Sequence, residues 1–157
     1  MTRIMALLTA LLTLAACVTT VEPRVAVPEN LKSTLNVSKI DVTTINGVSQ
    51  TVANKLADAV REELNKRQTG PTLVDLNLQV TKFNVVSGGM RFFTGAFSGS
   101  NTMNVTVRVF DPDNTQLADF DVRREANPGG YGAFYDQEAA TIRATAEGIV
   151  ETLYAKQ

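Results

Sequence analysis

The chain has 157 residues, of which 44% are hydrophobic and 20% charged, a composition typical of globular proteins and unlike that of disordered ones. Fifteen Lys and Arg residues nearly balance sixteen Asp and Glu residues, so no basic excess is available for binding nucleic acid. There is no histidine and only one cysteine, Cys17, which excludes histidine-based triads, histidine metal sites and internal disulfides.

The first sixteen residues have the order of charge and hydrophobicity that is typical of a secretory signal peptide. Arg3 supplies a positive charge, and a largely apolar run follows from Ile4 to Leu14. This run is too short to span a bilayer, which takes about 20 apolar residues. Residues 1–16 are therefore predicted to be a cleaved signal.

The end of this segment, Leu14-Ala15-Ala16-Cys17, resembles the lipobox of bacterial lipoproteins. The resemblance implies cleavage after Ala16, a diacylglycerol on the Cys17 thiol and an acyl chain on its freed amine. Acyl chains hold a protein at a membrane because each buried CH₂ contributes about 0.8 kcal/mol. The alternative is an ordinary signal peptide, cut at the same bond, that leaves a free thiol.

The residue after the cysteine is Val18. Lipoproteins of enteric bacteria that are retained in the inner membrane carry Asp at this position. The resemblance therefore implies attachment to the periplasmic face of the outer membrane, with inner-membrane retention as the alternative.

Residues 17–32 are predicted to be the lipidated cysteine and an extended tether. They contain Pro23 and Pro28, several charges and no clear hydrophobic period. Fifteen residues of extended chain reach at most about 50 Å, at roughly 3.3 Å each. Such a tether lets the domain stand away from the membrane.

A strand and a helix are predicted next. The run Ser33–Thr44 is rich in Thr, Val and Ile, and its apolar positions change phase after Val37, as a β-bulge would produce. Asn46-Gly47 ends the strand. Apolar residues then recur every three or four positions over residues 48–66, which predicts an amphipathic helix that ends before Gly70.

Three strands and a second helix complete the chain. Apolar and polar residues alternate over residues 74–85, 103–109 and 118–123, the period of strands with one buried face. Residues 111–114, Asp-Pro-Asp-Asn, are typical of a hairpin turn between the last two strands. Apolar positions at helical spacing over 139–153 predict the closing helix.

The order of these elements predicts a single α+β domain over residues 33–157. Its β-α-β-β-β-α order favours a sandwich in which both helices pack on one face of a mainly antiparallel or mixed sheet.

A resemblance to a known family covers about residues 33–156. It rests on LNLQVTKFNVV from Leu76, a Gly-rich stretch with Arg91 and Gly95, NVTVRVFDPDNTQLADFDV from Asn104, and the closing Ala-rich helix. The chain resembles the short Gram-negative lipoproteins called domain of unknown function 4410. Where that family has a turn glycine, this chain has Asn114 or Thr115, and Asn tolerates positive φ. The resemblance implies a fold and a compartment but no catalytic residue.

The segment Ser87–Ser100 is the candidate interaction site. It joins two strands, yet it carries apolar and aromatic side chains and one cation, which a simple turn does not need: Met90, Arg91, Phe92, Phe93 and Phe97. If exposed, they would form a contact surface for a protein groove or a lipid. The alternative is that they fold back under the sheet, or extend the two strands, and complete the core.

The acidic residues give no catalytic or metal constellation. Asp119 and Asp121 lie on one face of a strand, where cross-strand pairing with Arg108 and Arg123 explains them better than acid-base catalysis. Asp111 and Asp113 lack the glycine and distant Glu of a calcium loop. No metal and no cofactor are expected.

The leading hypothesis is a non-enzymatic lipoprotein that serves as a structural or accessory subunit of an envelope assembly. Its expected partners are the membrane, reached through the acyl chains, and an envelope protein. The alternative is a binding module for a lipid, glycan or small envelope ligand that uses the segment from Met90 to Phe97.

Overall fold

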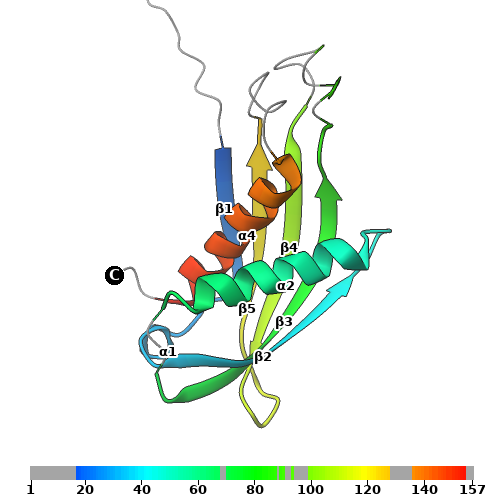
Figure 1. Ribbon diagram of the computed structural model, residues 1–157. Coiled ribbons are helices and arrows are strands. Elements are labelled where there is room, and N and C mark those ends of the chain that lie inside the picture. The colour runs from blue at the N-terminus through cyan, green and yellow to red at the C-terminus, as the bar shows by residue number, and fades with distance from the viewer. Residues whose placement is uncertain are drawn as a thin grey trace, which may run out of the picture.

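The protein is a five-stranded sheet with helices on one face (Figure 1). The computed structural model describes residues 17–67, 70–87, 89–90, 93, 99–127 and 136–154. The strands are β1 (Cys17–Val25), β2 (Leu35–Thr44), β3 (Thr72–Asn84), β4 (Asn101–Phe110) and β5 (Gln116–Ala126). The helices are α1 (Glu29–Lys32), α2 (Gln50–Leu64) and α4 (Gln137–Leu153).

The sheet is mixed, with the order β1-β5-β4-β3-β2. β2 and β3 run parallel and are joined through α2, whereas the other neighbours are antiparallel. Both long helices pack on the same face of this sheet (Figure 1). The predicted α+β fold, with its mixed sheet and two helices on one face, is confirmed.

The core lies between the helices and that face. Its largest fully buried side chains come from α2, α4 and the inward positions of the strands: Leu35, Leu56, Val60, Val74, Leu76, Leu78, Val80, Met103, Phe120, Ile149 and Leu153. Apolar and polar residues alternate in β3, β4 and β5 because each strand has one face in the core and one polar face.

Three local irregularities fall where the sequence predicts them. The register of β2 on β3 shifts between Val37 and Lys39, which is the predicted bulge. Asn46 (φ 58°) and Gly47 (φ 73°) end β2 in the left-handed region. Asn114 has φ 63° in the β4–β5 turn, so it fills the position that a glycine would otherwise take.

The predicted tether over residues 17–32 is wrong. Cys17–Val25 forms β1, an edge strand that pairs with β5 in register from Cys17 opposite Ala126, and Leu31 of α1 is buried in the core. Pro23 is tolerated because an edge strand has a neighbour on one side only, so a missing N–H need not break the sheet. The domain therefore includes residues 17–32 and does not begin at residue 33.

Two contacts hold β1 in place. Arg24 bonds to the β5 carboxylates, 2.9 Å from Nε to Asp119 Oδ1 and 2.5 Å from Nη1 to Asp121 Oδ2. On the other face, α4 passes so closely that a Cβ at Gly148 would lie 2.6 Å from Cγ2 of Thr19. A glycine at position 148 is thus what lets the helix approach the edge strand.

Replacing Gly148 with Leu should destabilise the protein by about 2 kcal/mol, because the side chain must displace Thr19 and overpacking typically costs about 1–3 kcal/mol. This loss of stability is expected although Leu favours a helix over Gly by about 1 kcal/mol. Urea unfolding would measure the change.

Glu147→Leu is the matched control, since Glu147 is the exposed neighbour in the same helix turn. Its unfolding free energy should stay within about 0.5 kcal/mol of the parent. An equally stable or more stable Gly148→Leu protein would mean that β1 does not pack against α4.

Candidate functional site

The candidate site is the end of the sheet at which β1 begins. Cys17 lies opposite Ala126, the last residue of β5, and Ala126 lies opposite Asn101, the first residue of β4. The chain that follows β3, the chain that precedes β4 and the chain that follows β5 therefore all leave the sheet at the end where β1 begins (Figure 1). The described residues of the candidate segment Ser87–Ser100 belong to this end.

A buried hydrogen-bond chain fixes the geometry of this end. The Asn101 side chain, 1% exposed, accepts the Val86 N–H at 3.0 Å through Oδ1 and donates from Nδ2 to Gln137 Oε1 at 2.7 Å. Gln137 opens α4 and is itself buried. Asn101 thus ties the base of the β3–β4 connection to the first turn of α4.

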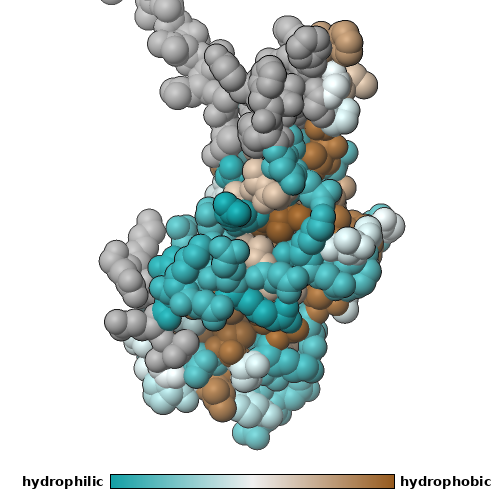
Figure 2. Space-filling model, in the orientation of Figure 1, coloured by the Kyte–Doolittle hydropathy of each residue, from teal (hydrophilic) through white to brown (hydrophobic). Residues whose placement is uncertain are grey.

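Two of the candidate contact residues are exposed. Met90 is 55% exposed and Phe93 is 85% exposed, so the alternative in which they complete the core is wrong for these two. Figure 2 shows hydrophobic surface at this end of the molecule, beside residues drawn in grey. Arg91, Phe92 and Phe97 lie outside the described residues.

An ionic cluster lies on the polar face of the sheet, near the middle of β5. Asp119 and Asp121 both bond to Arg24, and Thr106 Oγ1 donates to Asp121 Oδ1 at 2.6 Å. The hydrogen bond to Asp119, followed in importance by the hydrogen bond to Asp121, raises the pKa of the Arg24 guanidinium above its ordinary value. The cluster therefore acts as a cross-strand bridge between β1 and β5.

Of the two arginines predicted to pair with these carboxylates, one does so. Arg108 lies 3.6 Å from Asp119, as expected, but Arg123 pairs with Glu125 at 3.0 Å. The principal partner, Arg24, lies within residues 17–32, for which the sequence predicts a tether and no strand pairing. A basic residue at an alternating position before Val25 was the only available signal.

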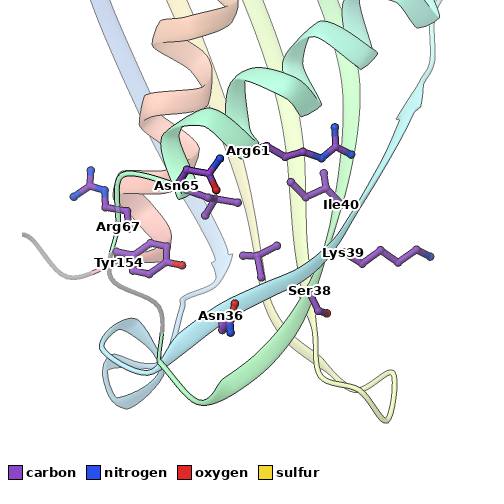
Figure 3. Close-up of a pocket in the computed structure, with 10 residues that line it drawn as sticks. Asn36, Ser38, Lys39, Ile40, Arg61, Asn65, Arg67 and Tyr154 are labelled. Carbon is purple, nitrogen blue, oxygen red and sulfur yellow. The ribbon is translucent and has the colours of Figure 1, made fainter.

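A cavity of about 510 Å³ lies at the other end of the domain, between β2 and the C-terminal turn of α2. Figure 3 shows Tyr154, Asn36 and Asn65 among the residues that line it, while the charged ends of Lys39 and Arg61 extend away from these three. The Tyr154 hydroxyl donates to the Leu35 carbonyl at 3.4 Å, and burial raises the pKa of Tyr154. Amides and hydroxyls of this kind suit a hydroxyl-rich ligand.

Two further observations concern the described part of the chain. Within it, no three His, Cys, Asp or Glu side chains gather closely enough to hold a metal ion. Among its helices, none has the length and apolar character needed to cross a membrane.

Comparison with known proteins identifies the fold. No family model and no curated protein matches the sequence. Two solved structures, the PelC dodecamer from Paraburkholderia phytofirmans and a single-substitution variant of it, are similar, with TM-scores of 0.53 and 0.52. Each is 13% identical, and the match covers 89% of this chain and 100% of the PelC chain. The likeness shows that the α+β architecture is that of PelC.

The Asn101–Gln137 tie yields a test of how this end is held. Asn101→Ala should lower the unfolding free energy by about 1–3 kcal/mol, because it leaves the buried Gln137 Oε1 without this donor and the Val86 N–H without its acceptor. A double-mutant cycle with Gln137→Ala should give a coupling of about 0.5–3 kcal/mol.

Asn84→Ala is the control, because the exposed Asn84 amide reaches only the Ser100 carbonyl, at 3.5 Å. The unfolding free energy of the Asn84→Ala protein should stay within about 0.5 kcal/mol of the parent. Strict additivity of the Asn101 and Gln137 substitutions would show that the tie does not couple the loop base to α4.

Proposed function

We propose that this chain is a lipoprotein held at the periplasmic face of the outer membrane through Cys17, and that its domain is a non-catalytic subunit of an envelope assembly. The observation that carries the proposal is the position of Cys17, which ends the lipobox-like Leu14-Ala15-Ala16 sequence and begins the first strand of the domain. Cleavage after Ala16 would leave the whole sheet intact.

A non-catalytic role is supported by how the acidic pair is used. Asp119 and Asp121 are both bonded to Arg24, and Asp121 also accepts from Thr106, so their oxygens are engaged in holding strands together. A general acid-base pair needs carboxyl groups that face a substrate and not the arginine of a neighbouring strand.

Assembly from several copies is supported by the comparison. The structures with the same fold are dodecamers. The domain also has two sheet edges, β1 and β2, and open edges are contacts that proteins use to pair with further chains. We propose that this chain, too, works as a multimer of identical subunits.

The anchor is tested on full-length protein expressed in a Gram-negative host. We expect the mature protein to begin at Cys17 and to carry the mass of the lipid on that residue, and we expect Cys17→Ser protein to lose the lipid and move to the soluble fraction. Thermal unfolding is the control, because the β1–β5 register uses the backbone of residue 17, which serine preserves. Mature protein that starts elsewhere, without lipid, would refute the anchor.

The assembly is tested by native mass spectrometry of the detergent-extracted protein. We expect a mass several times that of the 17.0 kDa precursor chain, and we expect the Cys17→Ser protein to form the same species because the lipid is not part of the interface. A monomer at every concentration would contradict the assembly. It would favour the alternative of a binding module that uses the segment from Met90 to Phe97, for which the cavity around Asn36 and Tyr154 is a further candidate site.

A further inference from the structure

The position of β1 determines how an anchored domain would meet the membrane. We infer that the end of the sheet at which β1 begins rests on the phospholipid surface, with Met90 and Phe93 in contact with the lipid. The inference rests on the proposed lipid anchor at Cys17 and adds an orientation and a second point of contact. Its partner is the bilayer that holds the acyl chains.

The first argument is that no flexible linker separates the proposed anchor from the domain. Cys17 is already paired with Ala126, so no free backbone separates a lipid on residue 17 from the sheet. A free segment of fifteen residues would have allowed a separation of up to about 50 Å. The sheet end is therefore confined to the membrane surface, and the described parts of the β3–β4 connection are confined with it.

The second argument is the chemical difference between the two ends of the sheet. Met90 and Phe93 expose apolar side chains at the end that carries Cys17. At the opposite end, the β4–β5 turn exposes Pro112, Asp113 and Asn114. Aromatic and long apolar side chains gain free energy at the boundary between headgroups and acyl chains, whereas a carboxylate there loses hydration.

The third argument is the charge just above this end. Lys82 and Arg123 are exposed and flank Asn104 in one row across β3, β4 and β5. This row lies three residues from Asn101, or about 10 Å at roughly 3.3 Å per residue. At that height Lys82 would meet the phosphate groups of the lipid headgroups, a favourable pairing at a membrane surface, while Arg123 already pairs with Glu125 at 3.0 Å.

The chain has no tryptophan, so one introduced indole reports a single position. Phe93→Trp places the probe at the proposed contact. Asp113→Trp is the matched control, because it lies in the exposed β4–β5 turn, about 30 Å away along the ten residues of β4. Both full-length lipoproteins are purified, their lipid is verified by mass, and they are reconstituted into phosphatidylcholine vesicles with and without brominated acyl chains.

We expect bromine to quench roughly half of the Phe93→Trp emission, since rings that contact a bilayer lie at its headgroup and acyl boundary. The Asp113→Trp emission should not change. If the lipid is present and neither indole is quenched, the surface contact is refuted while the anchor stands. Equal quenching of both refutes the fixed orientation. If the mass shows no lipid, the proposed anchor and this inference fail together.

Discussion

The pairing of β1 with β5 is the contact on which the rest of the structure depends. It brings Arg24 to Asp119 and Asp121, and it places Thr19 under α4, where only a glycine at position 148 leaves room. It also determines where Cys17 lies, because the register ends with Cys17 opposite Ala126. One edge strand therefore links the stability of the domain to the position of the proposed anchor.

The elements predicted from the sequence are those whose side chains repeat with a clear period. The alternation of apolar and polar residues in β3, β4 and β5 exists because each strand has one face in the core. The phase change in the apolar positions of β2 corresponds to a bulge at Ser38. β1 has no such periodicity of apolar side chains in its sequence. It lies at an edge, contains Pro23 and pairs with a strand about a hundred residues later, so neither periodicity nor local turn chemistry reveals it.

The candidate site was predictable in composition but not in geometry. The unusual apolar content of Ser87–Ser100 is visible in the sequence, yet the same residues suit a core or a surface. In the structure Met90 and Phe93 are exposed, and Asn101 ties the base of the β3–β4 connection to α4 through Val86 and Gln137. An asparagine at the first position of a strand carries no sequence signal of such a role.

The same geometry determines what an anchored domain could offer to other molecules. If the end with Cys17 is at the membrane, the opposite end faces the periplasm, because the strands between them run about 30 Å without a break. That distal end holds the cavity lined by Asn36, Asn65 and Tyr154 together with the start of the β2 edge. The long side of the sheet, with the Arg24 cluster, would then stand upright on the membrane. The lipid end and the distal cavity would be separate regions of one small domain, so a ligand in the cavity need not compete with the bilayer.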